Sequence, residues 1–199
     1  MIKEKIVLAS SNLDKVREIN ALLSNTSYKI IPQSTLNVIE ADETGTTFLE
    51  NALIKARNAA QHTKHPVIAD DSGIEVDALD GKPGIFSSRY AGPNASDRDN
   101  LNKLIKKIKR LDPKDCHARF ICSMVFLENL NEQDPIVVEG VWEGYVVTNP
   151  CGKNGFGYDP IFYIPSLGCT SAELSDDKKN ELSHRGQALR LLIKKITGK

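Results

Sequence analysis

The sequence predicts an α/β protein that folds as one domain. Short apolar runs typical of buried strands alternate along the chain with longer segments whose apolar residues recur at helical spacing. A chain of 199 residues with 40% hydrophobic content can bury one substantial core, and this length suggests one domain, or one domain with two lobes. We find no internal repeat, low-complexity tract or flexible linker in the sequence.

A strand, a loop and a helix open the chain. Residues 5–9 have the apolar core of a buried strand, and apolar residues then recur at helical spacing over residues 13–23. The loop between them, residues 10–15, brings small polar side chains and Lys15 to the start of the helix. Free backbone N–H groups and the helix dipole favour anions there, so the loop can hold phosphate. Alternatively, Ser11 or Asn12 only caps the helix.

A second strand and a capped helix follow. Residues 28–31 are typical of a short strand, which Pro32 ends. A polar, acidic loop comes next. Beyond it, Thr47 and Glu50 have the spacing of a capping box, which predicts a helix that continues to about His62.

The next segment predicts two strands that an acidic turn separates. An apolar run over residues 66–69 indicates a buried strand, and Asp70 and Asp71 stand where it ends and the chain turns. The alternation of residues 74–79 predicts a half-buried strand, and residues 81–84 make a further turn.

The second half of the chain continues the mixture of helices and strands. A basic amphipathic helix is expected over residues 97–111, and its lysines are more typical of a solvated face than of a nucleic-acid patch. Two strand-like runs joined by a short polar connection favour an antiparallel hairpin. The two runs are residues 118–127 and residues 136–147. They are followed by a glycine-bearing loop at 152–157, a short strand at 160–164 and a closing helix at 183–196.

Composition excludes several classes of protein. The formal net charge is +0, from 26 basic and 26 acidic residues, which argues against nucleic acid as a partner. The four cysteines form no C-x-x-C pair, so neither a zinc site nor a redox dithiol is indicated. No apolar run reaches the roughly 18 residues of a membrane helix, and the first residues lack the apolar region of a signal peptide. We therefore expect a soluble, cytoplasmic protein with no membrane partner.

Two acidic segments are the strongest chemical signal in the sequence. Glu40, Asp42 and Glu43 precede the capped helix, and Asp70 and Asp71 follow it. Adjacent acidic residues are costly unless a cation or a proton neutralises them. Mg²⁺ prefers oxygen ligands and often uses one or two carboxylates together with substrate phosphates, so a divalent metal is the first hypothesis. One aspartate could instead act as a base, or the acids could only solvate a loop and cap a turn.

A glycine-rich aromatic segment and a basic helix start carry further candidates. Phe156 or Tyr158, in residues 155–160, could stack on a nucleobase, although an aromatic turn packed on the core is equally compatible with the sequence. Lys179 and His184 lie near the start of the last helix and add donors for carbonyl or phosphate oxygens.

Together these segments resemble the Ham1/RdgB family of inosine/xanthosine triphosphate pyrophosphatases. The resemblance runs from Ile6 to Leu192, and its blocks occur in the family's order, which makes it highly specific. The blocks are SSNLDK at 10–15, ETGTTFLENALIKA at 43–56, ADDSG at 69–73, PGIFSSRYAG at 83–92, GFGYDP at 155–160 and AELSDDKKNELSHRGQAL at 172–189.

The resemblance implies a fold and an activity. The fold is an elongated, two-lobed, ITPase-like (Maf/Ham1) α/β domain over residues 1–199, with a long mixed twisted sheet, an active cleft between the lobes and a homodimer. The activity is Mg²⁺-dependent hydrolysis of ITP, dITP or XTP to the monophosphate and pyrophosphate, which clears deaminated purines from the nucleotide pool. The alternative is a Maf-like pyrophosphatase that acts on standard or modified pyrimidine nucleotides.

The resemblance also implies roles for individual residues. The triphosphate is held by Ser10, Ser11, Asn12, Leu13, Asp14 and Lys15, with Lys15 as the phosphate-contacting catalytic cation. Asp71 matches the proton acceptor and a metal ligand, Ser72 matches a substrate contact, and Asp42 with Glu43 matches the metal-binding loop.

The implied base-recognition residues are Phe156, Gly157, Tyr158, Asp159, Lys179, His184 and Arg185. A donor paired with O6 favours hypoxanthine or xanthine over adenine, whose amino group would leave that donor unpaired. One departure from the family is that Ser11 stands where a glycine is common.

Overall fold

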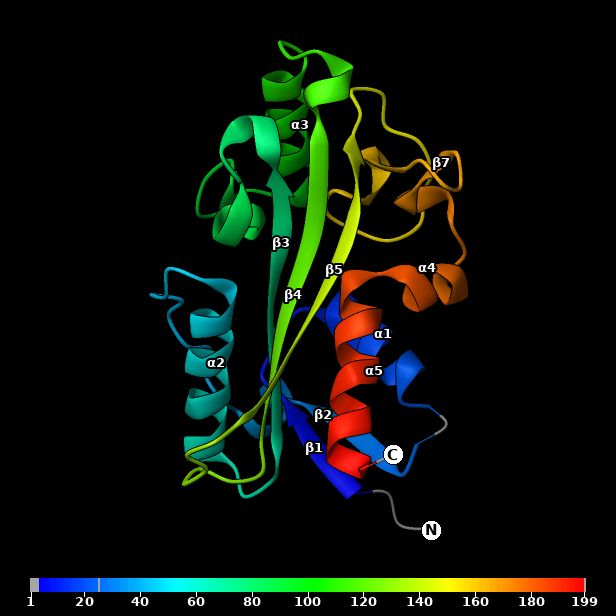
Figure 1. The fold of residues 1–199 in the computed structure, drawn as a ribbon. Coiled ribbons are helices and arrows are strands. Elements are labelled where there is room, and N and C mark those ends of the chain that lie inside the picture. The colour runs from blue at the N-terminus through cyan, green and yellow to red at the C-terminus, as the bar shows by residue number, and fades with distance from the viewer. Residues whose placement is uncertain (1–3, 25, 199) are drawn as a thin grey trace. The chain divides into compact units, whose positions relative to one another are not determined.

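Seven strands form one open, mixed sheet in the order β2-β1-β3-β4-β5-β6-β7 (Figure 1). The computed structural model describes residues 4–24 and 26–198, so the first three residues, which bear on the expected lack of a signal peptide, lie outside it. β1 pairs in parallel with β2 and β3, whereas β6 pairs antiparallel with β5 and β7. The strands are β1 (Glu4–Leu8), β2 (Tyr28–Pro32), β3 (Val67–Val76), β4 (His117–Leu127), β5 (Ile136–Val146), β6 (Phe162–Ile164) and β7 (Cys169–Thr170). The predicted α/β class is confirmed.

The chain divides into two compact units, and the division falls inside β3, β4 and β5. The first unit consists of Met1–Asp71, Cys122–Gly140 and Arg185–Lys199. The second consists of Ser72–Ile121 and Val141–His184. The expected cleft between two lobes stays a prediction.

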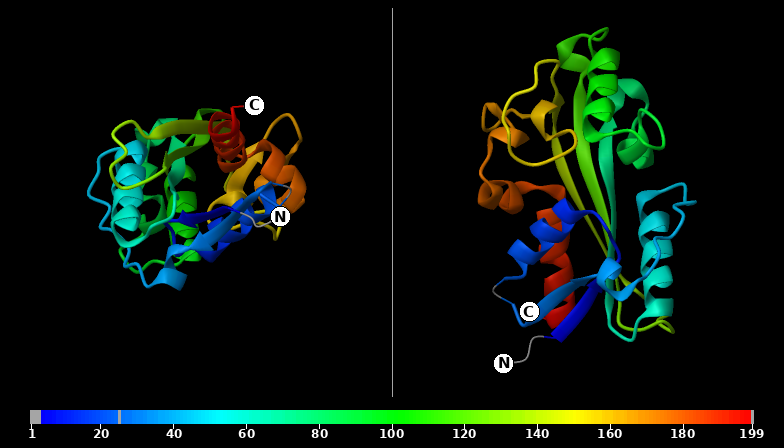
Figure 2. Two further views of the ribbon diagram at one scale, coloured as in Figure 1. Left: turned by 90° about the horizontal axis from the view of Figure 1, so that it is seen from below. Right: turned by 180° about the vertical axis from the view of Figure 1, so that it is seen from behind.

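Helices cover both faces of the strands in the first unit (Figures 1 and 2). On one face, Ile6, Leu8 and Ile68 pack in the same core cluster as residues of α1 (Leu13–Leu22) and α5 (His184–Thr197). On the other face, the intervening strand residues pack against the alanines of α2 (Phe48–His62). This division follows from the two-residue period of a strand. It means that neighbouring side chains on β3 meet different helices.

Local capping fixes where α1 and α2 begin. The Thr47 hydroxyl accepts a hydrogen bond from the Glu50 amide at 3.1 Å, and the Glu50 carboxylate accepts one from the Thr47 amide at 3.2 Å. The predicted capping box and the helix to His62 are therefore confirmed. At α1, the Asn12 side chain accepts hydrogen bonds from the amides of Asp14 and Lys15, which is a simple N-cap.

The second unit has its own aromatic core. Phe162 packs against both Phe120 and Trp142, whose ring centroids lie 4.6 and 5.1 Å from its own. α3 (Asp97–Ile108) packs its apolar face against this cluster. A short helix that the sequence analysis did not predict, α4 (Asp176–Leu182), begins at Ser175, whose side chain caps it.

The predicted turn at Asp71 to Gly73 is wrong, because β3 runs without interruption from Val67 to Val76. The predicted strand over 74–79 is correspondingly the end of β3 followed by a single 3-10 turn, Asp77–Leu79. The chain stays extended through the two aspartates because each carboxylate meets cations on its own side of the strand. Among the described residues, no helix is long and apolar enough to cross a membrane.

Candidate active site

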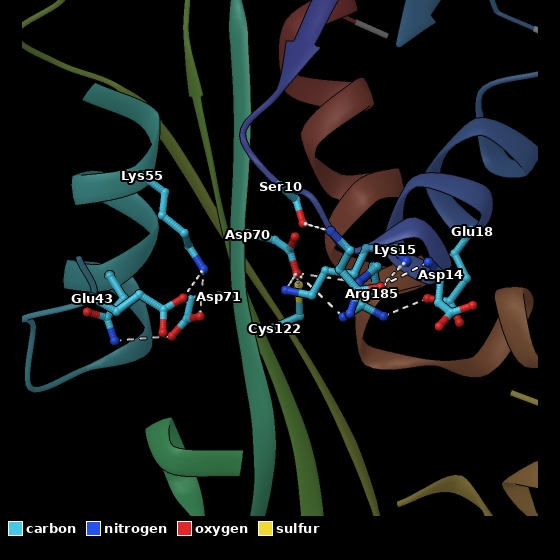
Figure 3. A network of polar contacts seen from close by, with 12 residues as sticks. Ser10, Asp14, Lys15, Glu18, Glu43, Lys55, Asp70, Asp71, Cys122 and Arg185 are labelled. Carbon is cyan, nitrogen blue, oxygen red and sulfur yellow. Dashed lines mark hydrogen bonds and ion pairs between the residues drawn. The ribbon is translucent and has the colours of Figure 1, made fainter. Parts of the chain in front are cut away.

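Asp70 and Asp71 point to opposite faces of β3 (Figure 3). Both are buried, with 0% and 6% of their surface exposed. Consecutive residues of a strand alternate between its faces, so the two carboxylates enter different surroundings. The interpretation of the doublet as one acidic pair that shares a cation is therefore wrong, and each aspartate has to be considered with its own partners.

Asp71 faces α2, where Lys55 holds it. The Lys55 ammonium lies 2.7 Å from Asp71 Oδ1 and 3.0 Å from Glu43 Oε1, so it joins the acidic loop to β3. Burial raises the pKa of Asp71, against the opposing effect of Lys55. Burial acts to lower the pKa of Lys55, but Asp71, Asp70 and Glu43 outweigh it and raise that pKa. The lysine therefore stays charged between two carboxylates.

Asn51, one helical turn before Lys55, fastens the acidic loop beside Asp71. Its amide donates to Asp71 Oδ2 at 3.3 Å, and its Oδ1 accepts from the Gly45 amide at 2.8 Å. A Cβ on Gly45 would stand 2.7 Å from that same Oδ1, so the loop can approach this closely only because residue 45 is glycine. The approach brings Glu43 to Lys55.

The two expected ligands of the acidic loop lie differently. Glu43 turns to Lys55, whereas Asp42 is exposed and its side chain makes no ion pair or hydrogen bond within the described residues. Across residues 4–24 and 26–198, no three His, Cys, Asp or Glu side chains are grouped so that they could hold a metal ion. Glu43 and Asp71 nevertheless converge on one cationic group. Two carboxylates that leave room for phosphate and water are the donor set that Mg²⁺ uses in nucleotide sites, so these residues fit such an ion.

Asp70 faces α1 and α5 on the other side of β3 (Figure 3). Its Oδ2 lies 2.9 Å from the Lys15 ammonium and 3.4 Å from Arg185 Nε, and Arg185 Nη1 contacts Glu18 at 2.5 Å. Burial alone would raise the pKa of Asp70, but Lys15 and Arg185 hold it well below its ordinary range. Burial also raises the pKa of the neighbouring Cys122 thiol to about 12. This face therefore holds two cations of the expected substrate site against the buried Asp70 and the half-buried Glu18.

The loop over residues 10–15 forms a capped helix start. Asn12 Oδ1 accepts from the amides of Asp14 at 2.9 Å and Lys15 at 3.1 Å, so the capping alternative is confirmed for Asn12. The Ser10 hydroxyl accepts from the Asn12 amide, and Ser10 is buried whereas Leu13 is 68% exposed. The Ser11 amide donates to Glu40 Oε1 at 3.1 Å.

Serine at position 11 is compatible with the conformation of this loop. Asn37 and Asp80 are the non-glycine residues with positive φ in the described chain, so Ser11 does not need the conformational freedom of glycine. The departure from the family's usual glycine therefore brings no backbone strain.

In the second unit, Asp159 draws together several residues expected to recognise the base. Its Oδ2 accepts from the Phe156 amide at 2.8 Å and from the Lys179 ammonium at 2.7 Å, and its Oδ1 accepts from Ser171. The Lys179 ammonium also lies 4.8 Å from the centre of the Phe156 ring. Gly155, with φ of +72°, allows this turn, since a Cβ there would stand 2.0 Å from Asp159 Oδ2.

The remaining predicted base contacts are more deeply packed. Tyr158 is 5% exposed and its hydroxyl donates to the Ser87 carbonyl, which is the core-packed alternative. His184 is also buried and stacks on Phe120, with ring centroids 4.7 Å apart. The Gly157 amide donates to Asp97 at the start of α3. Ser72 is half-buried on β3.

Sequence reasoning missed Asn51 and Lys55, and it considered Asp70 only as one of the acids that could hold a metal. The first two lie four residues apart, so they share a helix face with Ala52, Ala56 and Ala59. A lysine and an asparagine on the alanine face of an amphipathic helix, with acids on both sides in sequence, could have indicated a buried ion pair.

Comparisons with known proteins match nearly the whole length of this chain. The sequence pattern described as the Ham1 family matches residues 6–195. A relative from Vibrio cholerae serotype O1, named dITP/XTP pyrophosphatase, is 55% identical over 193 residues, which cover 97% of this chain and 96% of the relative. A dITP/XTP pyrophosphatase from Thioalkalivibrio sulfidiphilus is 52% identical over 98% of this chain and 100% of its own. The solved structure of a HAM1 protein from Coxiella burnetii superposes with a TM-score of 0.90 at 48% identity, covering 98% of this chain and 100% of that one.

Proposed function

This chain belongs to the Ham1 family, and on that premise we propose that it hydrolyses dITP, XTP and ITP to the nucleoside monophosphate and pyrophosphate. It is then a hydrolase of phosphoanhydride bonds that removes deaminated purines from the nucleotide pool. The relatives named dITP/XTP pyrophosphatase favour this activity over the Maf-like pyrimidine alternative.

The observation that supports this proposal best is the setting of Asp71. Its carboxylate is buried, is held by Lys55 and Asn51, and faces the same ammonium as Glu43. Burial raises the pKa of Asp71, which makes this carboxylate a better proton acceptor than an exposed one. We assign Asp71 as the base that orients the attacking water and takes its proton, with Lys55 and Asn51 fixing the direction of the carboxylate.

Membership of the family implies a divalent metal cofactor, and we propose Mg²⁺. Glu43 and Asp71 are the residues that would hold it, with Asp42 as the further acid of the same loop. When bound, such an ion withdraws negative charge from phosphoryl oxygens. Lys55 then keeps the two carboxylates together and offsets their repulsion.

Phosphate binding is assigned to residues 10–15 and Ser72. Lys15 is the cation of this group, and its ammonium stabilises charge that develops on the departing pyrophosphate. Asn12 holds the helix start in shape through its hydrogen bonds to the Asp14 and Lys15 amides. The Ser10 hydroxyl accepts from the Asn12 amide and so helps to shape the loop, and Ser11, Leu13 and Asp14 complete the predicted set.

Base recognition is assigned to residues that can donate to a 6-oxo group or stack on a ring. Phe156 offers the ring, and Asp159 fixes both its amide and the Lys179 ammonium. The positive charges of Lys179 and Arg185 suit a carbonyl oxygen at position 6 and disfavour the amino group of adenine. Gly157, Tyr158 and His184 complete the predicted set.

A substrate panel tests the proposal. Release of pyrophosphate from ITP, dITP, XTP, GTP, ATP and UTP should be measured with excess Mg²⁺, with Asp71→Asn as the inactive control. We expect rapid release from the first three nucleotides only. Preference for UTP would support the Maf-like alternative, and phosphate release from all six without pyrophosphate would exclude both.

The assembly and the compartment are further parts of the proposal. The resemblance implies a cytoplasmic homodimer, with neither nucleic acid nor membrane as partner. Light scattering during gel filtration tests the dimer, which would have twice the 22.0 kDa mass of one chain.

A further inference from the structure

We propose that Asp70 is a positioning residue that holds Lys15 in the orientation needed to grip the triphosphate. Asp70 is the first aspartate of the doublet and belongs to neither the proton-acceptor nor the metal assignment made above. The inference deepens the proposed function and rests on it, because Lys15 has its phosphate role only in that reaction.

The geometry of Asp70 suits it to orient a neighbour and not to contact a substrate. Asp70 is 0% exposed, and its Oδ1 accepts no hydrogen bond from any described residue. All the contacts described above run through Oδ2, which lies 2.9 Å from Lys15 Nζ, 3.4 Å from Arg185 Nε and 3.5 Å from Arg185 Nη2. The Cys122 thiol also lies 3.9 Å from Oδ2, so Lys15 and Arg185 are the charged groups on which Asp70 acts.

The contact leaves Lys15 able to bind an anion. A lysine ammonium has three N–H donors, and the ion pair with Asp70 uses one of them. The Lys15 side chain is 13% exposed, so the side chain that pairs with Asp70 is not closed off completely from solvent. The backbone of Lys15 is also held, because its amide donates to Asn12. A long flexible side chain is thereby fixed at both ends.

Stability alone is a weak reason for such a buried cluster. Lys15 and Arg185 face Asp70 and Glu18, so two positive charges balance two negative ones. Replacing a buried ion network with apolar side chains of similar volume is often neutral or stabilising. A carboxylate oxygen buried without a hydrogen bond adds a further cost. The arrangement is better explained by its effect on Lys15, whose ammonium it holds in one orientation.

A double-mutant cycle between Asp70→Asn and Lys15→Met tests the proposal. Misplacing a binding group by about 1 Å can cost about 100-fold, so we expect Asp70→Asn to lower kcat/KM for dITP by about 10- to 100-fold. In the Lys15→Met background the same substitution should have little further effect, because the group it positions is gone. Losses that multiply would overturn the proposal, as would wild-type kcat/KM in Asp70→Asn.

Binding of inorganic tripolyphosphate in EDTA gives a second readout that needs no turnover. We expect Asp70→Asn to raise the Kd about tenfold, because Lys15 is no longer held in place. If Asp70 only competed with the phosphates for Lys15, its removal would lower the Kd, and that result would contradict the proposal. A loss of fold stability alone would reduce the folded fraction without changing the Kd of the remaining folded protein.

Matched variants separate this inference from its alternatives. Glu18→Gln removes a carboxylate from the same Arg185 and keeps the ion pair between Asp70 and Lys15, so we expect kcat/KM within about twofold of wild type. If Asp70→Asn does not fold, Asp70→Glu keeps the charge and displaces it, and the same loss and the same cycle are expected. A wild-type protein that binds tripolyphosphate but hydrolyses no nucleotide would refute the proposed function, while the binding cycle still tests Asp70.

Discussion

Lys55→Met removes the positive charge that joins the acidic loop to β3. The substitution keeps most of the apolar side-chain volume, so no large cavity forms, but Glu43 and Asp71 lose the ammonium that lies 3.0 and 2.7 Å from them. Two carboxylates then face one another in a buried setting. We expect a less stable protein in the absence of metal, because their repulsion and desolvation are no longer offset.

The size of this effect follows from the burial of the three groups. The side chains are 13% exposed for Lys55, 9% for Asp71 and 25% for Glu43, so the cluster is more buried than a surface pair and less buried than an interior one. Surface pairs contribute about 0–1 kcal/mol, and breaking a fully buried pair costs about 3–5 kcal/mol. We expect the free energy of unfolding to fall by about 2–3 kcal/mol. For a chain of this length that corresponds to a Tm lower by roughly 4–12 °C.

Urea unfolding and thermal melts, each in EDTA and in excess Mg²⁺, measure the effect. Mg²⁺ should raise the Tm of Lys55→Met more than that of wild type, because it supplies the missing positive charge. Arg57→Met is the matched control: Arg57 is exposed on the same helix, and its loss should change stability by at most about 0.5 kcal/mol. If Lys55→Met is as stable as Arg57→Met in EDTA, Lys55 does not hold the acidic loop and the assignment of Glu43 to the site fails with it.

Two other outcomes follow from the same structure. Burial raises the folded-state pKa of Asp71 above its unfolded value, so the stability linked to this group is complete below the unfolded pKa and is lost as pH rises through the folded pKa. Asp71→Asn should therefore abolish turnover and yet unfold at the same or a higher urea concentration than wild type at pH 7. The difference in urea midpoint should vanish in acid. A large loss of stability at pH 7 would contradict this. The Cys122 thiol is buried, and its pKa is raised to about 12. In native protein, maleimide should therefore label the exposed Cys151 and leave Cys122 unmodified until urea is added. Mass spectrometry of the peptides measures the labelling of each cysteine.

The elements that the sequence predicted well are those whose signals are local. The capping box of Thr47 and Glu50 lies within four residues and was confirmed at α2. The alternative that Asn12 caps α1 was also confirmed, because the amides that the Asn12 side chain binds lie two and three residues later in the chain. α4 was missed because its seven residues, mostly charged, have no apolar repeat and are held by Ser175 and by their surroundings.

The part of the site that the sequence could not place depends on partners distant in the chain. Asp70 and Asp71 were expected to end a strand, because a charged doublet after an apolar run usually leaves the core. Their partners stand 55 and 16 residues earlier, at Lys15 and Lys55, and Arg185 adds a third cation from the last helix. Residue patterns alone do not show that these cations meet the strand from two sides.

The alternation of β3 also constrains how this protein can change over evolution. Deleting or inserting a single residue between Val67 and Asp70 would exchange the two carboxylates between the faces, even though the same dipeptide would remain. Asp70 would then meet the α2 lysine, and Asp71 would be turned toward Arg185. Gaps should therefore be selected against in this stretch more strongly than many substitutions, and a homologue that carries one should need a compensating change in the same strand.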